Sequence, residues 1–372
     1  RDEKRLHLAV ERDCEIAGQF NVLAIAQSGS EGLPVSISFD RGASFPLVTD
    51  VAPGSRTRLA RIFMAPDYKT AVLFWDFGAG SATSARLLLV EGAPASFDVN
   101  NSPDSFTFAA PIVLLTTGKS AVPLVPDVKY TSCGDAFVAY GVTEQLPNGI
   151  GRTTIGSFRR YAGDATFSGP VLLDDIEMIP FDPSIAVVGC GGTAQVWIAY
   201  ESPSGITIKR SMDGAQTFLD VVRFGTRSAY GPRLFARPGA GGATFVDCLF
   251  IDLNDTAIGT DLRLFHSDAD FGNASVYRIV EATPVTGTGG RNSVDAVGWF
   301  GFDATELNGK IYASVHVQRT EFFAPPMGGL GGFGRTTAAA PAAPRVLYPG
   351  MTQPVPAFDS NAEHRLSVIE IN

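Results

Sequence analysis

The chain has 372 residues, of which 45% are hydrophobic and 18% charged, and its net charge is −9. This amount of apolar material excludes global disorder, and an acidic chain without a basic run is not expected to bind nucleic acid or an anionic membrane. No apolar run approaches the ~20 residues that a membrane-spanning helix needs, so we expect no membrane span.

The composition predicts an all-β protein. The chain contains 40 glycines, 24 prolines and 26 phenylalanines, a combination typical of many turns and many aromatic strand residues. No stretch keeps an i, i+3, i+4, i+7 apolar stripe for three turns without a glycine or proline.

A short motif recurs along the chain at intervals of about sixty residues. It is clearest as SFDRGASF (residues 38–45), and related segments end on an aromatic at positions 108, 167, 218 and 277. Successive closing aromatics are 63, 59, 51 and 59 residues apart. Phe358 is a sixth candidate once the Gly/Pro/Ala-rich insertion 324–344 is removed. Repeats of this length are typical of propeller blades or solenoid turns.

The rest of the repeat predicts four short strands per unit, with the octet between the third and the fourth. Segments 126–140 and 183–200 each begin with proline, have a cysteine seven positions later, and end with Ala-Tyr. In the fourth unit the expected strands are 185–188, 194–200, 206–210 and 219–224.

We therefore predict one domain, residues 1–372, folded as an all-β, six-bladed β-propeller of four-stranded antiparallel blades. The 324–344 insertion is expected to be a long low-complexity loop in the last blade. The two terminal strands are expected to lie near each other and close the ring. Splitting residues 284–372 into two units would give seven blades instead.

The cysteines are widely spaced and contain no C-x-x-C pair, which argues against a zinc site. Cys14, Cys133 and Cys190 occupy one equivalent position in different repeats. Equivalent points on separate blades are normally farther apart than the ~7 Å that a disulfide allows between Cα atoms. We therefore expect these three not to pair with one another. For the four cysteines, Cys248 included, buried free thiols and disulfides of an exported protein remain the alternatives.

The octet resembles the Asp-box, or BNR repeat, of sialidase-like propellers. The best copy has Ser38, Asp40, Gly42 and Phe45, and a second has Ser211, Asp213 and Phe218. The resemblance implies that these residues are structural, because in that family the box is a turn between the two outer strands. Aspartate and serine side chains can bond the backbone amides of such a turn.

The resemblance to sialidases would also imply three arginines that bind a carboxylate, a tyrosine nucleophile with its glutamate, and an acid/base aspartate. No F/Y-R-I-P motif precedes the first box, which leaves this activity in doubt. The candidate ligand-binding residues are Arg58, Arg61, Arg233, Arg291, Tyr230 and Glu201. We could assign no catalytic residue.

Other chemistry is not indicated. The four histidines lack ligand spacing, the DADFGN segment lacks the later ligands of a calcium loop, and nucleotide-binding or hydrolase motifs are missing, so we expect no metal and no cofactor.

The favoured function is an exported propeller (periplasmic, cell-surface or secreted) that binds a glycan or protein partner without catalysis. The chain begins with Arg1 rather than methionine, as it would after removal of a leader or trimming. A sialidase-like exoglycosidase and a structural subunit of an envelope or filament assembly are the alternatives. The 324–344 loop would allow self-association or docking, with an uninvolved loop equally open.

Overall fold

The structure, a computed structural model, describes residues 6–10, 23–27, 32–38, 44–64, 69–78, 84–97, 103–118, 121–145, 151–177, 182–238, 243–253, 260–281, 283–286, 291–307, 310–323 and 364–371. These residues form antiparallel sheets and one 3-10 turn, η1 (Gly191–Thr193), without an α-helix among them. No helix in this part of the chain is long and apolar enough to cross a membrane. The all-β prediction is confirmed.

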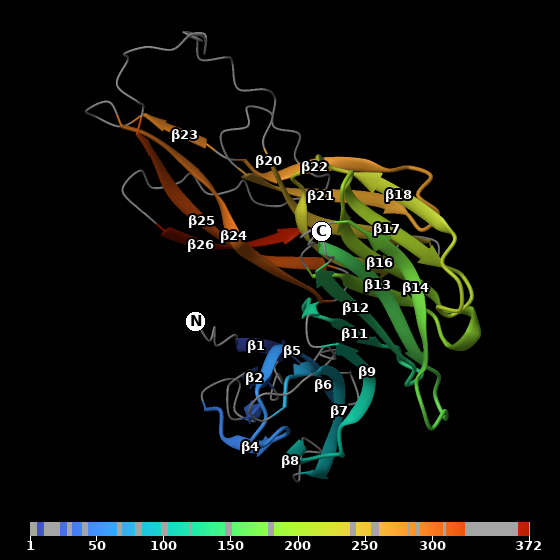
Figure 1. Ribbon diagram of the computed structural model, residues 1–372. Coiled ribbons are helices and arrows are strands. Elements are labelled where there is room, and N and C mark those ends of the chain that lie inside the picture. Colours follow the sequence, from blue (N-terminus) through green and yellow to red (C-terminus); the bar gives the residue numbers. More distant parts are fainter. Residues whose placement is uncertain are drawn as a thin grey trace. The chain divides into compact units, whose positions relative to one another are not determined.

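The chain divides into two compact units, Arg1–Pro203 with Thr207–Arg223, and Ser204–Ile206 with Phe224–Asn372. In both units each sheet is built from strands that follow one another along the chain, as the colours of Figure 1 show. The insertion 324–344, Phe358 and Cys14 lie outside the described residues.

The first three sheets belong to the first unit. Sheet 1 has the order β1-β2-β3-β4 (Leu6–Val10, Leu23–Gln27, Pro34–Ser38, Leu47–Asp50). Sheet 2 has the order β5-β6-β7-β8 with β9 also paired to β7 (Thr57–Met64, Thr70–Asp76, Ser84–Phe97, Pro103–Phe108, Ile112–Gly118). Sheet 3 has the order β10-β12-β13-β14 with β11 also paired to β12 (Val122–Pro123, Ala136–Gln145, Gly151–Arg160, Ser168–Ile176; β11 is Asp127–Tyr130).

The last three sheets have four strands each. Sheet 4 has the order β15-β16-β17-β18 (Ser184–Val188, Gln195–Ser202, Gly205–Ser211, Asp220–Phe224). Sheet 5 has the order β19-β20-β21-β22 (Tyr230–Pro238, Thr244–Leu253, Thr260–Asp268, Ser275–Val280). Sheet 6 has the order β23-β24-β25-β26 (Thr283–Thr286, Arg291–Leu307, Lys310–Phe323, His364–Ile371).

Sheet 4 confirms the predicted strands of the fourth unit to within one or two residues. In sheets 1, 3, 4 and 5 the octet segment connects the third strand to the fourth, as the repeat predicts. The terminal strands β1 and β26 belong to different sheets, and within the described residues each pairs with its neighbour along the chain, β2 and β25.

The prediction of one octet copy is wrong. The segment ending at Phe108 is not a turn, because β8 (Pro103–Phe108) is itself a strand that pairs with β7. Its alternating Phe106 and Phe108 explain this, since Phe106 is buried in the core between sheets 1 and 2 and Phe108 packs against that core. Alternation of apolar residues is a strand signal, and here it outweighs the likeness to the turn motif.

The core of the first unit lies between successive sheets, because central strands bury both faces. β6 is buried along its whole length. Val72 and Phe74 belong to the apolar cluster with sheet 1, whereas the alternate residues Leu73 and Trp75 belong to the cluster with sheet 3. The indole N–H of Trp75 donates to the carbonyl of Leu124 at 2.9 Å, so this fully buried ring keeps its hydrogen bond.

The turn after β17 depends on one carboxylate. Oδ1 of Asp213 accepts hydrogen bonds from the backbone amides of Gln216 (3.0 Å) and Thr217 (2.9 Å) and from the hydroxyl of Ser211 (2.7 Å). Gly214 has a φ of 66°, which favours glycine. Partial burial raises the pKa of Asp213, but the hydrogen bonds from Thr217 and Ser211 outweigh it and lower the pKa to about 2. Asp40 and Gly42 of the best octet lie outside the described residues.

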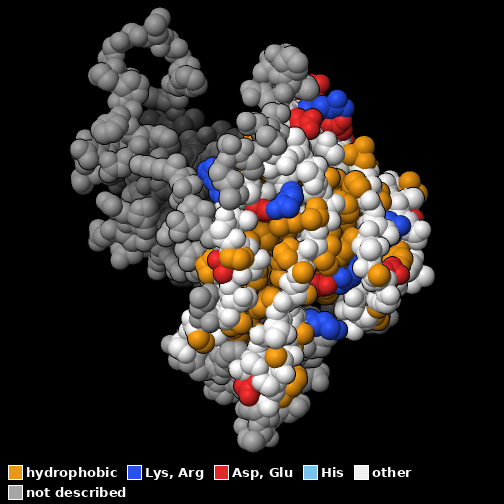
Figure 2. All heavy atoms as spheres, turned by 60° about the horizontal axis from the view of Figure 1, so that its bottom comes forward, with side chains coloured by type: hydrophobic (Ala, Val, Ile, Leu, Met, Phe, Trp, Pro, Cys, Tyr) orange, Lys and Arg blue, Asp and Glu red, His pale blue; other side chains and the backbone are white. Residues whose placement is uncertain are grey.

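Large apolar side chains are exposed on strands at the edges of sheets, among them Leu172 on β14, Val221 on β18 and Val276 on β22. Figure 2 shows one face of the molecule, on which hydrophobic side chains alternate with charged groups of both signs. The described part of this face therefore carries no large block of a single charge.

Candidate functional site

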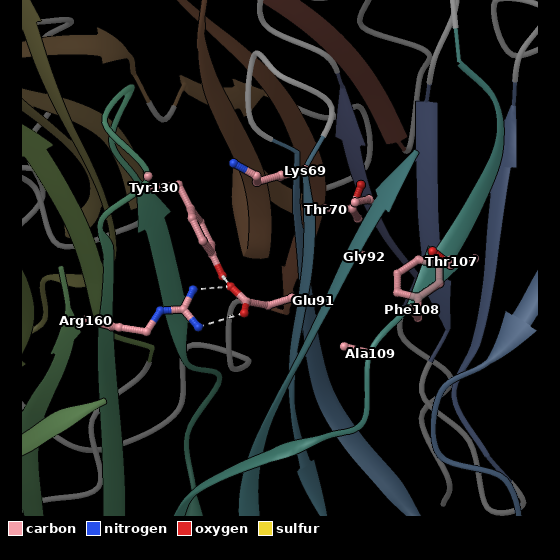
Figure 3. Close-up of a pocket in the computed structure, with 11 residues that line it drawn as sticks. Lys69, Thr70, Glu91, Gly92, Thr107, Phe108, Ala109, Tyr130 and Arg160 are labelled. Carbon is pink, nitrogen blue, oxygen red and sulfur yellow. Dashed lines mark hydrogen bonds and ion pairs between the residues drawn. The ribbon is translucent and has the colours of Figure 1, made fainter. Parts of the chain in front are cut away.

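A pocket of about 410 Å³ opens between sheets 2 and 3 of the first unit (Figure 3). It combines three charged side chains, two aromatic rings and small residues that expose backbone. Its lining consists of Lys69, Thr70, Glu91, Gly92, Ala93, Thr107, Phe108, Ala109, Tyr130, Gly134 and Arg160.

Strand register brings the polar side chains of the pocket together. Tyr130, the last residue of β11, pairs with Ala136 at the start of β12, and Ala136 pairs in turn with Arg160 at the end of β13. Tyr130 and Arg160 therefore flank one position of sheet 3. Glu91 comes from β7 of sheet 2, and its side chain points to both of them (Figure 3).

The three side chains form a closed hydrogen-bonded cluster. The hydroxyl of Tyr130 donates to Oε1 of Glu91 at 2.7 Å. Nη1 of Arg160 donates to Oε2 of Glu91 at 2.7 Å, and Nη2 of Arg160 donates to Oε1. The pair is bidentate, the strongest geometry for a guanidinium and a carboxylate. The side chains of Glu91 and Arg160 are 29% and 15% exposed, so the carboxylate still faces the pocket.

The cluster fixes the protonation state of each member. Burial raises the pKa of the Glu91 carboxyl, but the hydrogen bonds from Arg160 and Tyr130 outweigh it, so that its pKa lies below the usual value. Burial, together with the charge and hydrogen bond of Glu91, raises the pKa of Tyr130 well above its usual range. The hydrogen bond to Glu91 raises the pKa of Arg160. Near neutral pH the pocket therefore contains a carboxylate, a neutral phenol and a guanidinium.

Small residues and strand backbone (Gly92, Ala93 and Ala109) line the pocket beside the cluster. The ring of Phe108 lies against the backbone of Gly92, on the face of β7 opposite to Glu91, because paired residues share a face and successive strand residues alternate. The amide of Ala109 donates to the carbonyl of Glu91 at 2.8 Å, which holds the strand end beside the carboxylate. Behind the cluster, the ring of Tyr130 stacks on Phe63 with centroids 5.6 Å apart.

The candidate residues from the sequence do not line this pocket. They fall on four strands in two units: Arg58 and Arg61 on β5, Glu201 on β16, Tyr230 and Arg233 on β19, and Arg291 on β24. Arg61, Glu201 and Tyr230 are buried. The guanidinium of Arg58 is exposed, 5.8 Å from the ring centroid of Phe77, and Nη1 of Arg233 donates to the carbonyl of Pro232 at 3.1 Å. A ligand-binding role for the six stays a prediction.

The pocket residues carry only a weak signal in the sequence. Tyr130 ends the first strand of its repeat and Arg160 begins the octet of the same repeat, so polar groups at both strand ends of one unit were visible. Glu91 belongs to the preceding repeat, 39 positions before Tyr130, and nothing local relates the two. Among the described residues, no group of three His, Cys, Asp or Glu side chains has the arrangement of a metal site.

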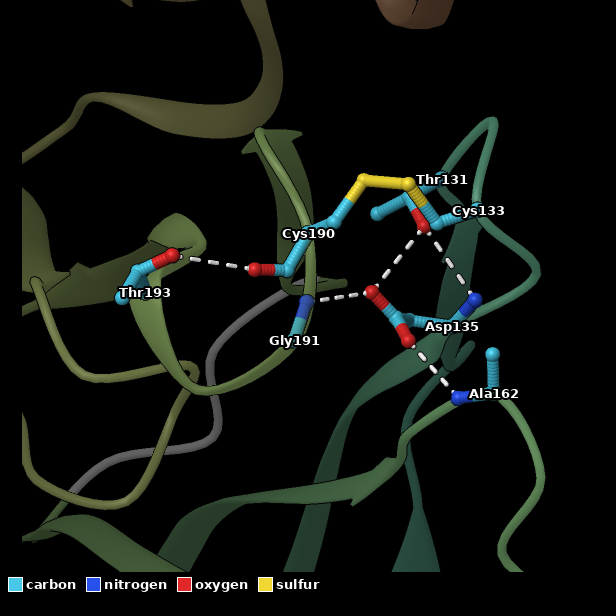
Figure 4. The surroundings of a disulfide bond; sticks show 7 residues. All are labelled: Thr131, Cys133, Asp135, Ala162, Cys190, Gly191 and Thr193. Atoms are coloured by element: carbon cyan, nitrogen blue, oxygen red, sulfur yellow. Dashed lines mark hydrogen bonds between the residues drawn. A yellow bond between two sulfur atoms is a disulfide. The ribbon is translucent and has the colours of Figure 1, made fainter.

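The expectation that the equivalent cysteines do not pair is wrong. Cys133 and Cys190 form a disulfide with their Cα atoms 6.1 Å apart, next to the pocket residue Gly134 (Figure 4). The two turns belong to neighbouring sheets, 3 and 4, and approach each other closely because Asp135 accepts a hydrogen bond from the amide of Gly191 at 2.6 Å. The remaining described cysteine, Cys248, is buried and free.

No protein-family model and none of the curated proteins matches the chain. Among solved structures it is similar to a Hadza microbial sialidase, with 12% identity and a TM-score of 0.48 over 83% of this chain and 62% of the sialidase. It is also similar to the polysaccharide lyase Uly1 (9% identity, TM-score 0.48, 84% of this chain and 74% of the lyase). An α-L-arabinanase of Penicillium chrysogenum, complexed with arabinobiose, has 13% identity and a TM-score of 0.48, over 84% of this chain and 88% of the arabinanase. The chain thus spans less than two thirds of the sialidase, and likeness at this level assigns neither an activity nor a ligand.

Proposed function

We propose that the protein is an exported β-propeller that binds a glycan without transforming it, and that the pocket between sheets 2 and 3 holds the ligand. The observation that carries the proposal is the hydrogen-bonded cluster of Glu91, Tyr130 and Arg160. Its protonation states suit a group that holds a ligand and not one that reacts with it.

Hydrolysis of a glycosidic bond needs a proton donor with a raised pKa and a nucleophile or base on the other side of the bond. In this cluster the shifts run the opposite way, because the pKa of Glu91 is lowered and that of Tyr130 is raised. Arg160 bonds both oxygens of the carboxylate. Glu91 is also the one carboxylate among the described residues that line the pocket, so a second acid is missing there.

Two further features support the architecture and the location. Successive four-stranded antiparallel sheets with a core between them are what stacked blades require. The disulfide between Cys133 and Cys190 supports export, since disulfides persist in oxidising compartments and are rare in the cytosol.

The test compares binding with turnover on the same sample. We expect retention of the protein on immobilised glycans, and no release of a chromophore from aryl glycosides, a sialoside among them. Glu91→Gln should abolish retention. Asp175→Asn is the control and should not abolish it, because it breaks only an exposed ion pair with Arg152 within sheet 3. Chromophore release that is lost in Arg233→Ala would instead establish a sialidase-like enzyme.

Two other outcomes separate the remaining alternatives. Binding to a protein partner that persists after its glycans are removed would replace the glycan by a protein surface as the ligand. Large assemblies on size-exclusion chromatography would favour a structural subunit. Self-association through the 324–344 loop stays a prediction, tested by deleting that loop and repeating the sizing.

A further inference from the structure

We infer that the pocket takes a saccharide carrying a sulfate or phosphate ester, with the ester bound by Lys69 and Arg160 and a sugar hydroxyl donating to Oε2 of Glu91. This inference rests on the proposed function, and it specifies the chemical class of the ligand. Three properties of the pocket carry it: the side chains that share its face, its excess of positive charge and its excess of hydrogen-bond donors.

The first property is the set of side chains that face the pocket from sheet 2. Paired residues share a face of a sheet, and successive residues of a strand alternate between faces. Thr107 pairs with Ala93, two positions after Glu91, so Thr107 and Glu91 lie on the same face. Lys69 also lines the pocket, and its charge acts on the carboxylate of Glu91. An ammonium, a hydroxyl and a carboxylate therefore border the pocket from this sheet.

The second property is an excess of positive charge. Two cations, Lys69 and Arg160, line the pocket together with one carboxylate, Glu91, so the cations exceed the anions by one. Asp164 also acts on Arg160, but it is not among the lining residues, and it accepts a hydrogen bond from the amide of Tyr161 in its own turn at 3.2 Å. An anionic group on the ligand would therefore be attracted to the pocket.

The third property is an excess of donors over acceptors. Glu91 accepts from Nη1 and Nη2 of Arg160, and a guanidinium has further N–H groups beyond these two. The ammonium of Lys69 and the hydroxyl of Thr107 add donors. On the acceptor side, Oε1 of Glu91 already accepts from Tyr130 and Arg160, whereas the described residues supply Oε2 with Nη1 of Arg160 alone. A ligand with several acceptor oxygens and one hydroxyl donor matches this arrangement.

The geometry favours a tetrahedral ester over a planar carboxylate. A carboxylate is bound best by a guanidinium fork, and Glu91 already occupies the fork of Arg160. The ammonium of Lys69 acts as a point charge with no preferred plane. A sulfate or phosphate ester presents oxygens in several directions, which suits donors that come from different strands. The volume of about 410 Å³ falls within the usual size of small-molecule sites, ~300–1,000 Å³.

The experiment is ligand-observed NMR with the full chain and matched methyl glycosides. Methyl galactoside and methyl glucoside are each used in four forms: neutral, 6-sulfate, 6-phosphate and the uronic acid. We expect the 6-sulfate or the 6-phosphate of at least one sugar to bind with a Kd at least about tenfold below those of its neutral and uronic acid forms, because charge-assisted hydrogen bonds are added. Comparison of the sulfate with the phosphate identifies which ester the pocket prefers.

Lysine variants test where the ester binds. Lys69→Met should remove the preference for the ester, whereas Lys69→Arg, which keeps the charge, should retain it. Lys310→Met is the matched control, because it removes the same charge from an exposed lysine of the other unit, paired there with Glu370, and should leave the preference unchanged. Lys69 is exposed, so its replacement should not unfold the protein, which circular dichroism and thermal unfolding check.

The outcomes distinguish this inference from the proposed function. Equal affinity for the neutral and esterified forms, or a preference for a uronic acid, would overturn the ester inference and leave the proposed binding function standing. A preference for the ester that survives Lys69→Met would place the anionic group elsewhere, with the same consequence. No binding of any saccharide by the folded protein at millimolar concentrations would overturn both.

Discussion

The carboxylate of Asp135 joins two neighbouring sheets, because its Oδ2 accepts a hydrogen bond from the amide of Gly191, 56 positions later, at 2.6 Å. Its Oδ1 accepts from the amide of Ala162 at 2.7 Å, in the octet of the same repeat (Figure 4). Asp135 is buried and lies beside the Cys133–Cys190 disulfide. One side chain and one covalent bond thus hold three turns at the end of the sheets where the pocket opens.

Replacing Asp135 with alanine should destabilise the protein by about 2 kcal/mol, because two part-buried hydrogen bonds, from the amides of Ala162 and Gly191, lose their charged acceptor. Chemical denaturation of the wild type and of Asp135→Ala measures this difference. Asp270→Ala is a suitable control, since Asp270 is exposed and accepts one turn amide, that of Gly272 at 3.1 Å. An equal effect of the two substitutions would contradict the role given to Asp135.

Removing the disulfide by Cys133→Ser with Cys190→Ser should lower the free energy of unfolding by about 2–4 kcal/mol. The residues are 57 positions apart, and the crosslink restricts the unfolded chain over that whole loop. Peptide mapping under non-reducing conditions should find the two cysteines joined. Cys248 should not react with thiol reagents in the folded protein, because burial raises the pKa of its thiol and excludes the reagent.

Asp135→Ala and the double serine variant should show coupling in a double-mutant cycle. The hydrogen bond of Asp135 and the disulfide both hold the turn of Cys133 against the turn of Cys190. The loss of unfolding free energy in the combined variant should therefore differ from the sum of the separate losses by at least about 0.5 kcal/mol. Strict additivity would mean that the hydrogen bond and the disulfide stabilise the turns independently.

The Asp213 turn should make stability depend on pH in the acid range. The pKa of Asp213 is about 2 in the folded chain and ordinarily 3.8, so the carboxylate stabilises the folded state above pH 3.8. This contribution is lost as the pH falls from about 4 to about 2. Thermal unfolding should therefore show Asp213→Asn less stable than the wild type at pH 6, with the difference shrinking toward pH 2. A difference that does not change over this range would contradict the assignment.

Gly92→Ala should destabilise the protein by about 1–3 kcal/mol, because the added methyl group overpacks a position that is already filled. The added Cβ would be 2.6 Å from the ring of Phe108, so the ring must move away from the core between sheets 1 and 2 that it packs against. Gly118→Ala in the same sheet is the matched control, because a Cβ there meets nothing within 4 Å. Chemical denaturation compares the two variants, and equal free energies of unfolding would argue against the close contact between Gly92 and Phe108.

Much of the strand arrangement could be predicted from the sequence, because the sequence signals for strands and turns are local. Hairpin pairing needs strands that are close along the chain, and the four strands of sheet 4 were predicted with small errors at their ends. The position of the octet between third and fourth strands was equally accessible, because a turn with Asp213 and Gly214 depends on its own few residues. The prediction of a turn ending at Phe108 was wrong because the apolar alternation of Phe106 and Phe108 favours a strand more strongly than the motif favours a turn.

The pocket could not be predicted from the sequence, because its residues are far apart along the chain. Glu91 and Arg160 are 69 positions apart on different sheets, and their ion pair exists only because sheets 2 and 3 pack face to face. The candidates that the resemblance suggested, such as Arg58 and Arg233, lie on separate units, so a count of arginines near first strands could not identify a site.

The all-β class, the four-stranded repeat and the turns between its third and fourth strands can be read from the sequence alone, since they depend on apolar alternation and turn chemistry within about sixty residues. The disulfide between Cys133 and Cys190 and the contacts of Glu91 with Tyr130 and Arg160 become apparent only in the folded chain. Both relationships join neighbouring sheets. The distance between equivalent turns is set by how the sheets pack, and spacing along the chain does not encode that packing.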